Sequence, residues 1–158
     1  MLNSSLDQDL EKIVIKNYVN MGIAVDTQEG LIVPNIKNVQ EKSIVNIAEE
    51  IAMLASAAKT RKLKIPDLKG ASFTISSLGA IGGKFFTPII NPPEVGILGL
   101  SKTFSKVVAQ NNGFESREFL PLSLSYDHRV INGAYAAKFV TQLGAALGDT
   151  SLMEKNFK

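Results

Sequence analysis

Apolar residues recur at steps of three and four over residues 43–61, the period of one face of an α-helix. Ser43 stands immediately before this run, where its hydroxyl suits a helix N-cap. Three cations, Lys59, Arg61 and Lys62, follow at the end that favours positive charge. The segment is therefore predicted to be a helix that ends before Pro66. Its apolar positions are Ile44, Ile47, Ala48, Ile51, Leu54, Ala55 and Ala58.

Residues 132–147 show the same helical period near the C-terminus. Asn132 precedes the run and is predicted to be its N-cap. The expected buried face consists of Tyr135, Phe139, Val140, Leu143, Ala146 and Leu147. A second helix is therefore predicted here.

Other segments carry the pattern of strands. Two apolar runs, 18–25 and 31–36, flank a turn at 26–30 and predict a β-hairpin, with Pro34 at an edge or bulge because proline cannot donate to a ladder. Further strands are predicted at 73–76, at 95–100 with an extension toward 108, and at 119–126, with a turn at 110–113. A glycine cluster follows at 78–83; without a Gly-Lys-Ser/Thr ending we interpret it as a tight turn, not a phosphate loop.

The alternation of helices and strands predicts one α/β domain with mixed or antiparallel strands. The length of 158 residues, with 45% hydrophobic and 20% charged residues, suits one globular domain. A formal charge of +2 gives no basic surface for nucleic acid or an anionic membrane. No leader-like N-terminus and no membrane-length apolar run are visible, so we expect a soluble cytoplasmic protein.

Residue counts restrict the chemistry further. The chain has no cysteine, which excludes disulfides, thiolate nucleophiles and cysteine-ligated metals. It has one histidine, His128, which is thus the candidate general base. His128 lies between a predicted strand and a predicted helix, where helix N-terminal amides could support a developing negative charge. The alternative is a strand-end histidine that merely hydrogen-bonds to the backbone.

The segment around His128, residues 127–133 (DHRVING), resembles the Asp-His-Arg-x-x-Asp-Gly signature of the 2-oxo acid dehydrogenase acyltransferases, the E2 components of those complexes. Chloramphenicol acetyltransferases share a shorter form of this signature, His-x-x-x-Asp-Gly. Further segments resemble the E2 catalytic domain in its usual order: 3–7 (NSSLD), 23–27 (IAVDT), 30–34 (GLIVP), 73–79 (FTISSLG), 88–94 (PIINPPE) and 97–99 (ILG). Residues 129–134 are most similar to the bacterial acetyltransferases of pyruvate dehydrogenase.

The resemblance implies a chloramphenicol acetyltransferase-like fold, with a mixed sheet and flanking helices, in a single partial domain over residues 1–158. It implies acetyl transfer between dihydrolipoamide and coenzyme A, with His128 as base, Ser76 as oxyanion donor and Asn132 as a third catalytic residue. Ser77 is the alternative to Ser76. No metal is implied, and the lipoyl group is carried on another domain or chain. Alternatives are a non-catalytic core subunit and a free-standing acyltransferase for small molecules.

The family resemblance also implies partners: a homotrimer or larger core, lipoyl domains, and the E1 and E3 components, without nucleic acid or membrane. His128 and Ser76 would come from neighbouring subunits. Two features depart from the family pattern. Position 132 is Asn where most members have Asp, and the family's N-terminal portion, with lipoyl and peripheral-subunit-binding domains, is expected to be missing. In the family, that portion supplies an arginine near the catalytic histidine. Asp26 resembles the residue that usually forms an ion pair with this arginine.

Overall fold

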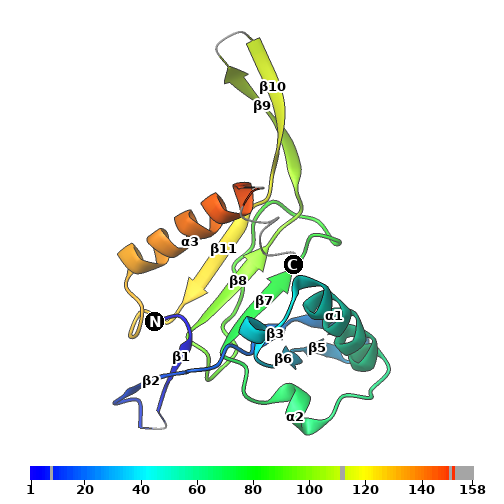
Figure 1. Ribbon diagram of the computed structural model, residues 1–158, viewed down its shortest axis with the longest axis vertical. Helices are drawn as coiled ribbons and strands as arrows, with labels where there is room; N and C mark the ends of the chain where they lie inside the picture. Colours follow the sequence, from blue (N-terminus) through cyan, green and yellow to red (C-terminus); the bar gives the residue numbers. More distant parts are fainter. Residues whose placement is uncertain (8, 111–112, 150, 152–158) are drawn as a thin grey trace.

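The computed structural model describes residues 1–7, 9–110, 113–149 and 151. A mixed sheet with strand order β11-β8-β7-β3-β6 lies at its centre (Figure 1). The strand β7 is parallel to both of its neighbours, whereas β11 and β6 are antiparallel to theirs. The strands are β3 (Met21–Ile23), β6 (Asn35–Ile36), β7 (Phe73–Ser77), β8 (Gly96–Leu100) and β11 (Leu122–Tyr126).

Both predicted helices are present. Helix α1 (Ile44–Lys59) begins after Ser43, whose hydroxyl accepts a hydrogen bond from the Asn46 amide at 3.2 Å. Helix α3 (Gly133–Gly148) begins after Asn132 and lies along β11 (Figure 1). Among the described residues, no helix has the length and hydrophobicity to cross a membrane. The mixed sheet with flanking helices confirms the expected fold class.

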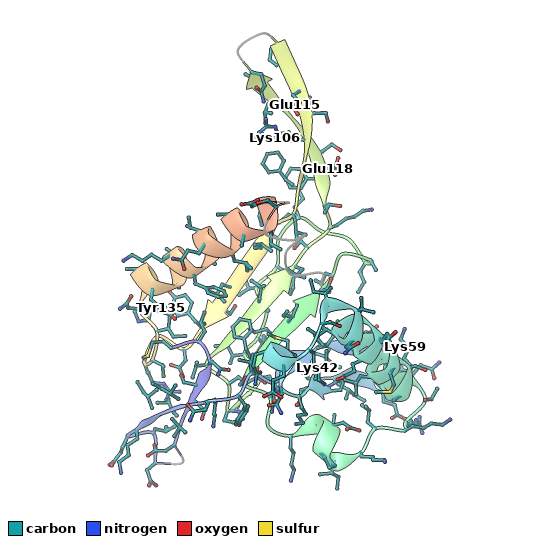
Figure 2. All side chains as sticks on the ribbon, viewed as in Figure 1. Lys42, Lys59, Lys106, Glu115, Glu118 and Tyr135 are labelled. Carbon is teal, nitrogen blue, oxygen red and sulfur yellow. The ribbon has the colours of Figure 1, made fainter. Side chains whose placement is uncertain are left out.

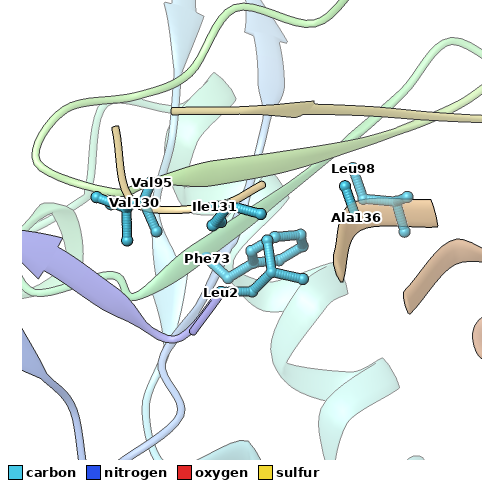
Figure 3. Packing of buried hydrophobic residues seen from close by; sticks show 7 residues of the cluster. All are labelled: Leu2, Phe73, Val95, Leu98, Val130, Ile131 and Ala136. Carbon is cyan, nitrogen blue, oxygen red and sulfur yellow. The ribbon is translucent and has the colours of Figure 1, made fainter. Parts of the chain in front are cut away.

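The hydrophobic core lies between the sheet and α3 (Figure 3). Phe73 of β7 packs edge-on against Phe139 of α3, with ring centroids 6.3 Å apart. Val130 and Ile131, which connect β11 to α3, are also buried, and Ile131 is only 1% exposed. The buried cluster consists of Leu2, Phe73, Val95, Leu98, Val130, Ile131 and Ala136. The segment after β11 is thus anchored in the core.

The predicted hairpin over residues 18–36 is shorter than expected. The strands β4 (Val25–Thr27) and β5 (Gly30–Ile32) form it, and Gly30 closes the turn at a φ of 118°. The flanking segments β3 and β6 pair with each other in the central sheet. Pro34 lies before β6, the edge strand, as its missing N–H requires.

The strand predicted from residue 95 does not continue to 108. It ends at Leu100, and β9 (Phe104–Gln110) then pairs with β10 (Gly113–Phe119) in a separate two-stranded ribbon. The sequence of β10, GFESREF, is too polar to predict a strand. The segment predicted over 119–126 is divided between the end of β10 and β11. Of the predicted turn at 110–113, residues 111–112 lie outside the described part of the chain.

Several short elements were not predicted. They are β1 (Ser4–Leu6), β2 (Ile13–Ile15), the 3-10 helix η1 (Val39–Glu41) and α2 (Ile65–Leu68). Pro66 follows the end of α1, as expected. It also lies in the first turn of α2, where a missing backbone N–H is tolerated. Elements of two to four residues leave too little periodicity to be predicted.

Candidate active site

His128 lies in a tight turn between β11 and α3, as predicted. The Asp127 carbonyl accepts hydrogen bonds from the amides of Val130 and Ile131, at 3.0 and 2.9 Å. The Asp127 amide donates to the Val95 carbonyl at 2.8 Å, which ties the turn to the start of β8. Because Val130 and Ile131 are buried behind the turn, the intervening His128 side chain is displayed to solvent.

An ion pair flanks the histidine within the same turn. The Arg129 guanidinium Nη2 lies 2.6 Å from Asp127 Oδ2, and the Arg129 backbone amide donates to Oδ1 at 3.0 Å. The hydrogen bond from the Arg129 side chain is the main cause that lowers the pKa of the Asp127 carboxyl. Sequence analysis did not assign this pair a role, although opposite charges on either side of the sole histidine were a visible signal.

The imidazole of His128 has no hydrogen bond to any of the described residues. Its ring lies 5.7 Å from that of Tyr126, tilted by 39°. The alternative interpretation, a histidine that hydrogen-bonds to the backbone at a strand end, is therefore not what the structure shows. Both ring nitrogens remain available to exchange protons with a ligand.

Asn132 serves as the N-cap of α3, four residues after the histidine. Its side-chain Oδ1 accepts a hydrogen bond from the Tyr135 amide at 2.9 Å. The Asn132 side chain thus uses its carbonyl to satisfy the helix and keeps its amide NH₂ as a donor. An aspartate could fill the same cap but would have no such donor.

Ser76 lies near the end of β7 and is half-buried. Its register partner in β8 is Gly99, which in turn pairs with Ser123 of β11. Successive strand residues alternate between faces, so Ser76 lies on the face opposite Phe73 and the hydrophobic core. A Cβ at Gly99 would lie 2.7 Å from the Phe86 ring, so glycine lets that loop approach the sheet beside Ser76.

Ser77 points to the other face of β7 and is exposed. Its hydroxyl accepts a long hydrogen bond, 3.4 Å, from the Gly79 amide in the glycine turn. No hydrogen bond of the Ser76 hydroxyl occurs within the described ranges. Neither serine therefore donates its hydroxyl proton to an acceptor among the described residues, and they differ in that Ser76 is half-buried on the face opposite the core.

One chain does not bring Ser76 and His128 together. Ser76 shares a row of the sheet with Ser123, whereas His128 follows Tyr126, three rows further along β11. Three residues along a strand span about 10 Å, and two spacings between neighbouring strands also span about 10 Å. These two distances are at right angles, so Tyr126 is about 14 Å from Ser76. His128 follows Tyr126 at the opposite end of the sheet from Ser76. No single substrate bond could contact both side chains of one chain.

Asp26 is exposed on β4, which follows β3 at the end of the sheet that carries Ser76, since the Ala24 amide donates to the Ile75 carbonyl at 2.9 Å. It lines a cavity of about 430 Å³ with Thr27, Gln28 and Lys59. No cation lies within ion-pair distance of it in the described part of the chain, so its carboxylate is solvated. Nor do any three His, Asp or Glu side chains of the described residues gather to hold a metal ion.

A buried acid near the histidine turn escaped the sequence analysis. Glu94 is 5% exposed, and burial raises the pKa of its carboxyl, while the Asn91 amide partly lowers it. Asn91 Nδ2 donates to Oε1 at 3.0 Å. The other oxygen, Oε2, is buried without a partner at hydrogen-bond distance among the described residues. Glu94 lines a cavity of about 420 Å³ with Asp127 and Arg129.

Comparison with known protein families places residues 1–154 in register with one of them, described as 2-oxoacid dehydrogenases acyltransferase (catalytic domain). Two similar curated proteins are the dihydrolipoyllysine-residue acetyltransferase components of the pyruvate dehydrogenase complex from Buchnera aphidicola and Azotobacter vinelandii. They are 50% and 54% identical over 94% and 93% of this chain. The chain spans only 38% and 23% of their respective lengths.

Two solved structures show the same arrangement of elements. One concerns the role of a serine, a histidine and an asparagine in the catalytic mechanism of Azotobacter vinelandii dihydrolipoamide acetyltransferase; it is 52% identical, with a TM-score of 0.90. The other is the cubic core of a pyruvate dehydrogenase multienzyme complex, 53% identical, also with a TM-score of 0.90. Each match covers 94% of this chain and 61% of the solved chain.

Proposed function

The chain belongs to the family of 2-oxoacid dehydrogenase acyltransferase catalytic domains, and from this premise we propose that it transfers an acetyl group between dihydrolipoamide and coenzyme A. The similar curated proteins are acetyltransferase components of the pyruvate dehydrogenase complex, which favours the same complex for this chain. The match over residues 1–154 favours one partial catalytic domain rather than two domains.

The observation that carries the proposal is the spacing of three residues. In the solved Azotobacter enzyme, the histidine follows the serine by 52 residues and the asparagine follows the histidine by four. His128 follows Ser76 by 52 residues, and Asn132 follows His128 by four. This agreement supports Ser76 over Ser77 and supports Asn132 as the third residue of the site.

His128 is the proposed general base, because its exposed imidazole has no competing hydrogen bond to the residues that the structure describes. It takes the thiol proton as the sulfur attacks the carbonyl carbon of the thioester. For reference pKa values of about 6.5 and 8.5, complete transfer from a thiol to an imidazole is uphill by roughly 2.7 kcal/mol. Transfer concerted with attack lowers that demand, and a positioned base supplies a factor of ~10²–10⁴.

Attack converts the carbonyl oxygen into an oxyanion, which Ser76 is proposed to stabilise with its free hydroxyl proton. The tetrahedral intermediate then expels the original thiolate sulfur, which takes the proton back from His128. The reaction therefore exchanges one thiol for another without net change in protonation. Asn132, through its unused amide NH₂, is placed to hold the reacting groups beside His128. Coenzyme A and a lipoyl group on another domain or chain are the substrates.

Two copies are needed to build this site, since Ser76 and His128 of one copy lie at opposite ends of the sheet. The proposed assembly is a homotrimer or larger core in the bacterial cytoplasm. Its proposed partners are lipoyl domains and the E1 and E3 components. The solved cubic core at 53% identity supports assembly of this kind.

The test is complementation between two inactive variants, His128→Ala and Ser76→Ala, coexpressed in equal amounts. A site is intact when its His128 comes from the Ser76→Ala copy and its Ser76 comes from the His128→Ala copy. Random cyclic assembly would therefore restore about a quarter of wild-type acetyl transfer. A mixture of His128→Ala with the double variant S76A/H128A is the control and should stay inactive.

The outcomes separate the candidate functions. Recovery in the mixture supports a shared active site. A wild-type chain that assembles without acetyl transfer from acetyl-CoA to dihydrolipoamide would instead identify a non-catalytic core subunit. Transfer to an unrelated small acceptor, with none to dihydrolipoamide, would identify a free-standing acyltransferase.

A further inference from the structure

The His128 imidazole has a single ring contact in the described part of the chain. Its centroid lies 5.7 Å from the centroid of the Tyr126 ring, and the two planes are inclined by 39°. Tilted aromatic pairs at such a separation attract each other, because the positive edge of one ring approaches the negative face of the other. Since no hydrogen bond orients the imidazole within the described ranges, the Tyr126 ring is the side chain that restrains it.

Tyr126 is itself held firmly in the fold. It is the last residue of β11, where it pairs with Gly96, and its side chain packs against the buried hydrophobic cluster. A Cβ at Gly133 would lie 3.5 Å from Tyr126 Oη, so the phenol reaches over the first residue of α3. The ring is therefore fixed by the sheet, by the core and by the start of the helix.

A ring contact suits a general base better than a hydrogen bond does. A neutral imidazole has one donor nitrogen and one acceptor nitrogen, and a hydrogen bond to the protein would occupy one of them. The contact with Tyr126 restrains the His128 side chain and leaves both nitrogens unoccupied. A base that is already restrained loses less conformational freedom when it meets the thiol.

The polar groups on either side of His128 have other partners. Arg129 Nε donates to Asp127 Oδ1 at 3.0 Å, and Arg129 Nη2 donates to Asp127 Oδ2 at 2.6 Å. Asn132 Oδ1 accepts a hydrogen bond from the Tyr135 amide at 2.9 Å. None of these side chains hydrogen-bonds to the imidazole, so Tyr126 is the neighbour left to orient it.

We propose that Tyr126 is a positioning residue, whose ring holds the His128 imidazole with a nitrogen toward the attacking thiol. The proposal rests on the proposed function, in which His128 is the base. The ring is the active part of Tyr126, because its hydroxyl has no hydrogen bond to the residues that the structure describes. Tyr126 acts through His128 and does not itself exchange a proton with the substrate.

Three variants separate the ring from the hydroxyl and from general packing. Y126L removes the ring and keeps apolar bulk, whereas Y126F keeps the ring. Y135L is the matched control: Figure 2 shows Tyr135 at the start of α3, where its hydroxyl accepts a hydrogen bond from the Met1 amino group at 3.3 Å. Within the described residues, Tyr135 makes no ring contact with His128.

Steady-state kinetics with acetyl-CoA and dihydrolipoamide give the first readout. The kcat of Y126L should be about tenfold lower than that of the wild type, the scale that one aromatic pair supplies. Y126F and Y135L should stay within twofold of the wild-type kcat. The KM for coenzyme A should stay within twofold in all three variants, because positioning of the base does not bind that substrate.

Nuclear magnetic resonance gives a second readout that does not depend on activity. The chain has one histidine and three tyrosines, so the imidazole protons form a single set of signals. The wild type and Y126F should show a nuclear Overhauser effect between the imidazole and the aromatic ring at position 126. In Y126L the imidazole signals should move toward their positions in the urea-unfolded chain. The wild-type spectrum alone tests the contact if Y126L does not fold.

The outcomes that contradict the proposal are distinct. Equal kcat for Y126L and the wild type, or an equal loss in Y126F and Y126L, would overturn the role of the ring. Acetyl transfer by a wild type without the Overhauser effect would overturn that role alone and leave the proposed function standing. The Overhauser effect without any acetyl transfer would overturn the proposed function and the positioning role together.

Discussion

The two ends of the central sheet are built in different ways. At the His128 end, the turn is tied to β8 by the bond from the Asp127 amide to Val95, and Ile131 is buried behind it. At the Ser76 end, the strand runs into a glycine turn in which Ile81 is 74% exposed. One end is packed and internally bonded; the other carries a free hydroxyl and a hairpin that projects into solvent.

This difference shows which part of the candidate site is complete in one chain. The histidine end has its turn, its ion pair and its helix cap in place without any partner. The serine end carries the Ser76 hydroxyl, the proposed oxyanion donor, beside a glycine turn that is open to solvent. A shared active site would combine a preformed base from one copy with an oxyanion donor that the assembly encloses.

The largest expected effect is at the packed end. Replacing His128 with alanine should abolish acetyl transfer, with a loss of ~10²–10⁴ from removal of a positioned base. The side chain is exposed and bonded to none of the described residues, so oligomer size and melting temperature should not change. Steady-state assay with acetyl-CoA and dihydrolipoamide, alongside sedimentation, measures both. Retention of most activity would remove His128 from the mechanism.

The next effect concerns the open end. Ser76→Ala should lower kcat by ~10²–10³, which corresponds to roughly 2.7–4 kcal/mol for a lost oxyanion donor. The apparent affinity for coenzyme A should stay nearly constant, since the interaction forms in the transition state. Ser77→Ala is the control on the other face of the same strand and should have little effect. A change confined to KM would assign Ser76 to binding instead.

The sequence predicted the packed end better than the open one. Apolar periodicity and capping residues located α1 and α3, because both depend on contacts within a few residues. The motif around His128 also indicated a strand-to-helix junction with Asn132 as cap. The hairpin was missed because β10 is exposed on both faces, and an exposed strand carries no alternation for a pattern to detect.

Distance within the site could not be derived from the sequence either. The family motifs place Ser76 and His128 in one candidate site. The directions of their strands decide whether the two residues lie at the same end of the sheet. The strand β11 runs antiparallel to β8 while β7 runs parallel to it, so the two residues fall at opposite ends. Their origin in different subunits stays a prediction from the family resemblance, and the register shows only that one chain keeps the two residues apart.

A stability comparison between the two ends gives the third prediction. Ile131→Ala removes a side chain that is 1% exposed and should reduce the free energy of unfolding by about 2–5 kcal/mol. Ile81→Ala, at the open end, should change it by less than about 0.5 kcal/mol, as for other exposed positions. Urea denaturation of both variants measures the difference. Similar losses at the two positions would show that the open end is packed in solution.

The smallest effect tests the buried acid at the packed end. Because burial raises the pKa of Glu94, the folded chain holds its proton to higher pH than the unfolded chain does. Stability from this group is therefore present below the unfolded pKa and is lost as pH rises toward the raised folded value.

Glu94→Gln keeps the acceptor for Asn91 and removes the charge. It should stabilise the fold by about 1 kcal/mol near neutral pH, the scale of one buried polar group. The gain should vanish well below the ordinary pKa of a glutamate, where both states are protonated. Urea denaturation over that pH range decides the matter, and a constant difference between the two proteins at every pH would show that Glu94 does not titrate on folding.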